Sequence, residues 1–217
     1  MSNHFANQFT LYDFSQDVLL DGNPDPEARK GVCVALCDFW LKNIMDNVSE
    51  PPPRRLIQLE GEFDAIVQYQ GRYRQARNPA DPFQARQQAA RSLGLNYEEQ
   101  TTIMRAPQGR AMIPGLAGTR GIREKLATDL ERPFNGSTWS LRGPPSREYP
   151  RGWGHAIAGF TSMRSETANM HTKTVHVFDP NFGEYAGDYV SLEAILADLF
   201  GKADFYAHVT EVRRVTE

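Results

Sequence analysis

The first hundred residues carry apolar side chains at steps of three and four, which is the spacing of one helix face. The pattern is clearest over residues 30–47, where it consists of Cys33, Cys37, Trp40, Leu41 and Ile44. Turn residues precede this predicted helix at 23–27, and three prolines follow it at 51–53. The sequence therefore predicts one long amphipathic helix near the start of the chain.

A helical pattern resumes at Arg54 and continues to about Met104. One amphipathic helix is marked by Leu56, Leu59, Phe63, Ile66 and Val67, and a second runs from Phe83 to Leu93. Residues 78–82 read Asn-Pro-Ala-Asp-Pro and predict the loop between them. A further helix is predicted over residues 121–130.

Beyond Gly136 the texture changes to the alternating and β-branched residues typical of strands. Strands are predicted at 137–141, 154–163, 173–179 and 203–215, with one helix at 191–200. Helices first and antiparallel strands afterwards indicate an α+β fold. We expect a single domain over residues 1–217, with a mainly helical lobe to about 135 and a sheet lobe from about 136.

Composition narrows the function classes. The 217 residues hold 24 Lys+Arg against 27 Asp+Glu, a formal net charge of −3, which argues against a nucleic-acid partner. No apolar run approaches the ~18 residues of a transmembrane helix. The glycine-containing stretches match no phosphate or dinucleotide fingerprint, and the two cysteines support no zinc site, so we expect no cofactor and no metal.

Cys33 is the first candidate for chemistry, because it lies at the predicted start of the first long helix. The unpaired N–H groups and dipole of a helix N-terminus stabilise an anion, so they favour the reactive thiolate. Cys37, one turn later, falls on the apolar face and is assigned to the core. The alternative interpretation is that Cys33, like Cys37 and like most free cysteines, is only a small buried apolar residue.

His155 and Asp179 are the second candidate. His155 opens one predicted strand and Asp179 closes another, joined by a polar loop around 164–171. A regular antiparallel hairpin pairs position 155 with 179 and position 161 with 173, so the two side chains lie opposite each other. A carboxylate there would fix the imidazole tautomer and hold the ring toward a nucleophile. Taken alone, each residue is better explained by a structural role, with Asp179 capping a turn and His155 a satisfied strand histidine; together with Cys33 they favour an active site.

The remaining polar residues are predicted to be structural or solvent-facing. His171 is expected in the loop, and His176 on the strand face opposite Asp179. His4 and His208 lie near the chain ends. A solvated helical face is the expected environment of the arginines at 72, 74, 77, 86 and 91.

Three sequence blocks resemble the YopT-type cysteine proteases, a papain-like family of bacterial effectors that includes AvrPphB. Residues 31–40 (GVCVALCDFW) resemble the nucleophile helix, residues 154–158 (GHAIA) the histidine strand, and residues 178–184 (FDPNFGE) the aspartate block. They occur in the family's order over about 150 residues. The resemblance implies a papain-like fold in which Cys33 is the nucleophile, His155 the base and then the acid, and Asp179 the residue that orients it.

The resemblance also implies an oxyanion hole formed by the Cys33 backbone N–H and an upstream amide. Where papain has its oxyanion glutamine this chain has Glu27; Gln16 and Asn23 are the upstream amides, and we favour Gln16. Members of the family act inside host cells, some on prenylated Rho-family GTPases and others on kinases. The implied partner is thus a host protein, with the chain a monomer.

A secretory signal is absent from the first 30 residues, so delivery by a type III-like route is expected. Two alternatives to an endopeptidase stay open. The same three residues would serve a glutamine deamidase or acyltransferase, because an acyl-enzyme accepts other groups. The chain would otherwise be a binding module on a papain-like fold with weak or lost catalysis.

Overall fold

The computed structural model describes residues 9–26, 28–76, 82–97, 120–143, 145, 147, 150, 152–167, 170–202 and 211–216. Its α-helices are α1 (Gln16–Leu20), α2 (Cys33–Asp46), α3 (Pro52–Gly61), α4 (Phe63–Ala76), α5 (Pro82–Arg91), α6 (Arg120–Asp129) and α7 (Leu192–Lys202). Short 3-10 turns, η1 (Ala28–Lys30) and η3 (Tyr189–Ser191), precede α2 and α7.

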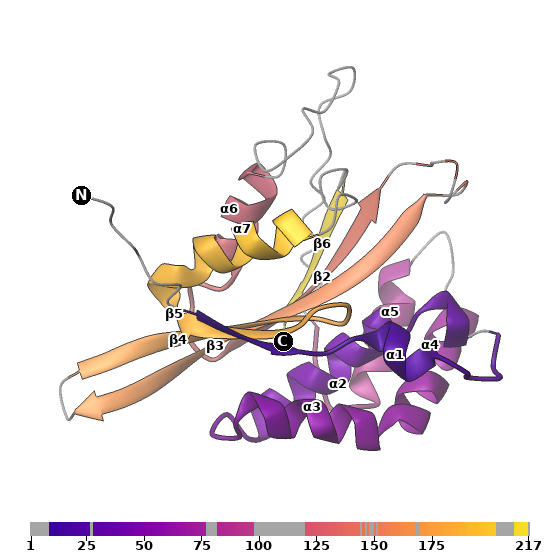
Figure 1. The fold of residues 1–217 in the computed structure, drawn as a ribbon, viewed down its shortest axis with the longest axis horizontal. Coiled ribbons are helices and arrows are strands. Elements are labelled where there is room, and N and C mark those ends of the chain that lie inside the picture. The colour runs from indigo at the N-terminus through magenta and orange to yellow at the C-terminus, as the bar shows by residue number, and fades with distance from the viewer. Residues whose placement is uncertain are drawn as a thin grey trace.

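The strands form one antiparallel sheet. They are β1 (Phe9–Asp13), β2 (Asn135–Gly143), β3 (Trp153–Thr167), β4 (Met170–Asp179), β5 (Gly183–Asp188) and β6 (Glu211–Thr216), in the spatial order β1-β5-β4-β3-β2-β6. Helices cover both faces, with α2–α5 on one side and α6 and α7 on the other (Figure 1). The predicted α+β fold is confirmed.

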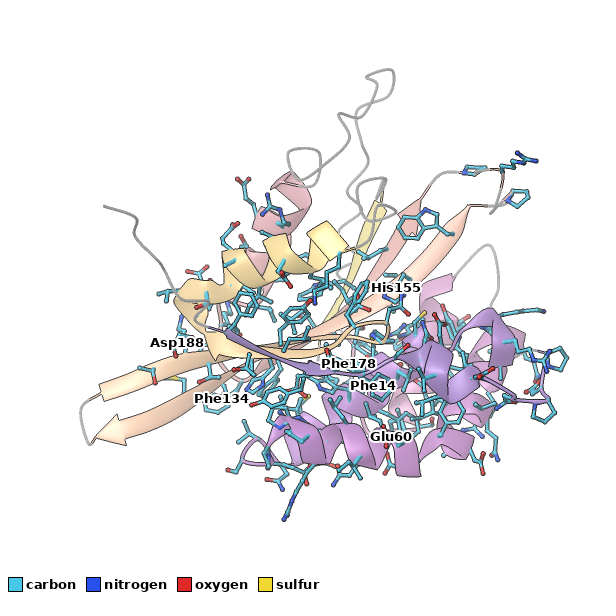
Figure 2. The ribbon with its side chains drawn as sticks, viewed as in Figure 1. Phe14, Glu60, Phe134, His155, Phe178 and Asp188 are labelled. Atoms are coloured by element: carbon cyan, nitrogen blue, oxygen red, sulfur yellow. The ribbon has the colours of Figure 1, made fainter. Side chains whose placement is uncertain are left out.

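Helix α2 is the centre of the first helical layer. Buried residues occupy most of its circumference, from Ala35 to Leu41 and again at Ile44. Trp40 stacks on Phe178 of β4 at 5.5 Å between ring centres, and Phe14 packs edge-on against the same ring. Figure 2 shows Phe14 and Phe178 together in this layer. The position of α2 against the sheet is therefore set by aromatic packing in the core.

The β3–β4 hairpin brings His155 and Asp179 together in a register that differs from the prediction. Thr161 pairs with Val175 and Met163 with Lys173, a shift of two residues from a regular pairing of 161 with 173. Because side chains alternate with a period of two, the shift leaves Asp179 on the predicted face. Asp179 becomes a diagonal neighbour of His155 instead of its direct opposite.

The polar loop predicted around residues 164–171 is wrong, because the two strands continue through most of that stretch. Strand β3 runs to Thr167 and β4 begins at Met170, so most of the stretch 164–171 is strand. His171 lies in β4 and not in a loop. The hairpin extends beyond both neighbouring strands, because the β2 pairing reaches only Thr161 and the β5 pairing only Thr174.

Three further differences concern element boundaries. The apolar pattern over 56–67 predicted one helix, but Glu62 separates α3 from α4 there. Strands β1 and β5 were not predicted. The last strand was predicted over 203–215; β6 begins at Glu211, and residues 203–210 lie outside the described part of the chain, as do 77–81 and 98–104.

Candidate active site

The start of α2 is shaped by two glutamines from other elements. Gly31, at a φ of 91°, turns the chain into the helix, and Val32 occupies the N-cap position without a side-chain cap. The Val32 N–H instead donates to Gln16 Oε1 at 3.0 Å, and the Ala35 N–H donates to Gln70 Oε1 at 3.0 Å. Two of the orphan donors of the first turn are thus satisfied, and the Cys33 N–H lies between them.

Cys33, His155 and Asp179 come together from three elements: the first residue of α2, the start of β3 and the end of β4. His155 Nε2 lies 3.0 Å from Asp179 Oδ1, and the His155 ring is hydrogen-bonded to the Cys33 thiol. Asp179 is fully buried and His155 nearly so, while Cys33 is half-buried. Figure 2 shows His155 at the sheet end that faces the helices. The structure therefore places the three predicted residues in one connected chain of side chains.

The electrostatics of this chain favour charge separation between thiol and imidazole. Burial on its own would raise the pKa of Cys33, but the hydrogen bond and charge of His155, the Ala156 N–H and the Arg86 cation together lower it below its usual value. Burial would also lower the pKa of His155, yet Asp179 and Cys33 outweigh it and raise that pKa to about 10. A thiolate beside an imidazolium is the arrangement these shifts stabilise.

Cys37 has the opposite environment. It is fully buried, and burial together with the nearby Cys33 raises the pKa of its thiol well above the usual value. A protonated, enclosed thiol is unreactive. The assignment of Cys37 to the core is confirmed.

Gln16 links α2 to the loop after β4. Its Oε1 accepts from Val32 N–H, and its Nε2 donates to Asn181 Oδ1 at 2.6 Å. The Asn181 N–H in turn donates to Asp179 Oδ1 at 2.7 Å. An amide nitrogen carries two hydrogens, so Gln16 Nε2 can donate a second hydrogen bond, and the side chain contacts the residue that precedes Cys33 through the Val32 N–H. Asn23, the other upstream amide, is occupied differently, as its Oδ1 accepts from the Asp25 N–H.

Asp38 and Arg86 form a buried ion pair that the sequence did not reveal. Arg86 is 4 % exposed and donates to Asp38 Oδ1 at 2.5 Å, while Tyr69 and Tyr97 each donate a hydroxyl to Asp38 at 2.6 Å. The prediction that Arg86 lies on a solvated face is wrong, because Asp38 on α2 supplies a buried partner charge. Asp38, next to Cys37 in an apolar stretch, was the only available signal.

A second buried cluster surrounds Glu184 on β5. Glu184 accepts from Trp40 Nε1 at 2.8 Å, from Arg55 Nη2 at 2.6 Å and from His176 Nδ1 at 3.0 Å. His176 is therefore a structural residue and is not solvent-facing. The cluster connects α2, α3, β4 and β5, and it lies close to the turn between Asp179 and Gly183.

In the part of the chain that the structure describes, no group of three or more His, Cys, Asp or Glu side chains is arranged to hold a metal ion. Nor does any helix among those residues have the length and apolar character needed to cross a membrane.

Comparison with known proteins identifies the fold. The crystal structure of the Pseudomonas avirulence protein AvrPphB superposes on this chain with a TM-score of 0.60, covering 91 % of this chain and 98 % of that one. The two sequences are 19 % identical. No family model and no curated protein sequence matches the chain. The chain therefore has the AvrPphB fold, in agreement with the resemblance found in the sequence blocks.

Proposed function

We propose that this protein is a cysteine endopeptidase of the bacterial effector type that cleaves a host protein. The observation that carries the proposal is the connected chain from Cys33 through His155 to Asp179, in which the His155–Asp179 contact is 3.0 Å. The lowered pKa of Cys33 and the raised pKa of His155 support it, because a nucleophile and a general acid require those two states.

In this mechanism the Cys33 thiolate attacks the carbonyl carbon of the scissile amide and forms a tetrahedral oxyanion. The oxyanion accepts hydrogen bonds from the Cys33 N–H and from the second Nε2 hydrogen of Gln16. When the C–N bond breaks, the His155 imidazolium transfers its proton to the leaving amine, and a thioester joins the substrate acyl group to Cys33. His155, now neutral, removes a proton from water, which attacks the thioester and releases the acid product; the C–S bond breaks and restores the Cys33 thiolate beside the His155 imidazolium.

Asp179 serves this cycle as the orienting residue. It binds His155 at Nε2, so the other ring nitrogen, Nδ1, is directed to the thiol. Its Oδ1 is itself held by the Asn181 N–H, and Asn181 is held by Gln16. The oxyanion amide and the orienting carboxylate are thus connected through one residue, Asn181.

The substrate class follows from the resemblance to the YopT-type proteases. Prenylated Rho-family GTPases and host kinases are the first candidates, and delivery into the host cell by a type III-like route is part of the proposal. The net charge of −3 implies that a membrane-bound substrate is found by specific contacts, because bulk attraction to an anionic lipid surface needs the opposite sign.

The test is to incubate the purified chain and its Cys33→Ala variant with candidate host proteins and to measure intact masses. Two fragments whose masses sum to that of the substrate plus one water are expected with the wild type only. A mass gain of about 1 Da without fragments would identify a glutamine deamidase instead. A complex formed equally by both proteins, with no mass change, would contradict catalysis and leave a binding module.

A further inference from the structure

Arg86 of α5 is a buried cation held from several sides. Its Nη2 donates to Asp38 Oδ1 of α2 at 2.5 Å and to Thr138 Oγ1 of β2 at 3.0 Å. Its guanidinium carbon lies 6.0 Å from the ring centre of Tyr73 and 5.7 Å from that of Tyr97. The guanidinium is therefore fixed in place between α2, α4 and the sheet.

This arrangement is costly if it serves stability alone. A buried ion pair recovers its desolvation cost only when all its polar atoms are satisfied. Among the described residues, the buried Nε of Arg86 has no hydrogen-bond partner. An apolar pair of similar volume would fill the same space without that cost. The position of the charge therefore calls for a second explanation.

The charge lies beside the helix that carries the nucleophile. Asp38 follows Cys33 by five residues and Cys37 by one, so the pair contacts α2 within two turns of its start. The groups facing Arg86 are Asp38, the hydroxyls of Tyr69 and Tyr97 that donate to Asp38, and the Tyr73 ring. Burial and the neighbouring Asp38 raise the pKa of Tyr69 and Tyr97, so both hydroxyls remain neutral.

Asp38 accepts hydrogen bonds from three donors and holds the Arg86 guanidinium beside α2. Arg86 Nη2 and the two tyrosine hydroxyls all donate to Asp38. The Arg86 cation lowers the pKa of Cys33, adding to the effects of His155 and the Ala156 N–H. His155, which is held by Asp179, contacts the same thiol from the sheet side.

We propose that Arg86 is a positioning residue for the nucleophile: a buried cation, anchored on α2 by Asp38, that stabilises the Cys33 thiolate together with His155. This inference rests on the proposed function, because it assigns Arg86 a part in preparing the same cysteine. It gives α5, which carries Arg86, a role in the chemistry as well as in the shape of the fold.

The test measures the apparent pKa of Cys33 from the rate of iodoacetamide alkylation between pH 4 and 10, with Cys33→Ala as the blank. Arg86→Gln removes the charge and keeps a side chain that can donate to Asp38, so we expect the apparent pKa to rise by roughly 0.5–1. Arg86→Lys keeps the charge and restores the wild-type value. Arg54→Gln, the same change at an exposed arginine on α3, is the matched control and leaves it unchanged.

In Asp38→Asn, the direction in which the apparent pKa of Cys33 changes distinguishes an electrostatic effect from a loosened helix. The substitution removes the anion while Arg86 remains, so the apparent pKa of Cys33 stays level or falls, whereas general loosening of the helix would raise it in both variants. The double variant Asp38→Asn with Arg86→Gln removes both charges, and we expect the pKa to rise; it carries the test if Arg86→Gln does not fold. Equal shifts in the two single variants, or no shift in Arg86→Gln and the double variant, would overturn the proposal. An ordinary thiol pKa in the wild type would instead contradict the proposed function.

Discussion

Replacing Asp179 with asparagine tests how the imidazole is held. The substitution preserves size and lets the side-chain oxygen accept from His155 Nε2 or the Asn181 N–H, which lie 3.0 and 2.7 Å from Asp179 Oδ1. It removes the negative charge that favours the imidazolium. The geometry is therefore largely retained while the electrostatic support is lost.

The size of the effect follows from the pKa of His155. That pKa is raised from 6.5 to about 10, mainly because Asp179 and Cys33 outweigh the effect of burial. Each pKa unit is worth about 1.4 kcal/mol, so the protonated ring is stabilised by about 5 kcal/mol. With Asp179 as the larger of the two contributors, we expect Asp179→Asn to lower the pKa of His155 by about 2 and to slow alkylation of Cys33 most clearly near pH 9, where the protonated fraction of the ring falls about tenfold.

Two measurements test these expectations directly. NMR titration of the His155 ring gives its pKa, and the pH profile of alkylation gives the reactivity of Cys33. Stability gives a third. A raised pKa stabilises the fold fully below pH 6.5 and loses this contribution as pH rises through about 10, so wild type and variant should differ more at pH 6 than at pH 10. Asp188→Asn, an exposed aspartate at the far end of β5, is the matched control (Figure 2).

A His155 pKa that stays within half a unit of the wild-type value in Asp179→Asn would refute the reasoning. It would mean that the carboxylate does not govern the protonation of the ring, whatever the distance between the two groups. A variant that titrates as expected but alkylates at the wild-type rate at pH 9, where its ring is mostly neutral and the wild-type ring mostly protonated, would show that the imidazolium does not sustain the thiolate.

Four further outcomes are expected. Alkylation should be lost in Cys33→Ala and retained in Cys37→Ala, because burial keeps the Cys37 thiol protonated; mass spectrometry of the labelled chain checks this. Substrate turnover should rise with formation of the Cys33 thiolate below pH 9 and fall as His155 deprotonates at about pH 10, as a pH–rate profile would record. Gln16→Ala should weaken the binding of a peptide aldehyde, whose adduct carries an oxyanion, by about 10²-fold in an inhibition assay. Glu184→Ala should lower the free energy of unfolding by about 3–5 kcal/mol in urea, because it leaves a buried arginine without its counter-ion.

The parts of the fold predicted correctly are those with a strong local period. Helices α2, α6 and α7 and strands β2–β4 each carry a run of apolar residues at the spacing of their own structure. Strand β5 does not: its sequence, Gly183 to Asp188, is rich in glycine and acid, and Glu184 is buried only because Arg55 and His176 reach it from elsewhere in the chain. Such long-range compensation leaves no trace in local pattern.

The candidate site shows the same division. His155 and Asp179 were placed near each other from strand ends alone, and the face was predicted correctly although the register differed by two residues, because only the parity of the pairing determines the face. Arg86 could not be assigned, because its burial depends on Asp38, 48 residues earlier. Gln70 was likewise missed, since capping of α2 from α4 is set by packing between the two helices.

The central claim is that Cys33 cleaves peptide bonds in host proteins, and chemical labelling of newly formed protein N-termini in a host-cell lysate tests it most directly. Lysate treated with the wild-type chain should yield a small set of new N-termini, absent after treatment with Cys33→Ala and restricted to one or a few proteins. Identical sets of N-termini from the two treatments, with a wild-type preparation whose Cys33 is shown on a separate sample to react with iodoacetamide, would contradict the account.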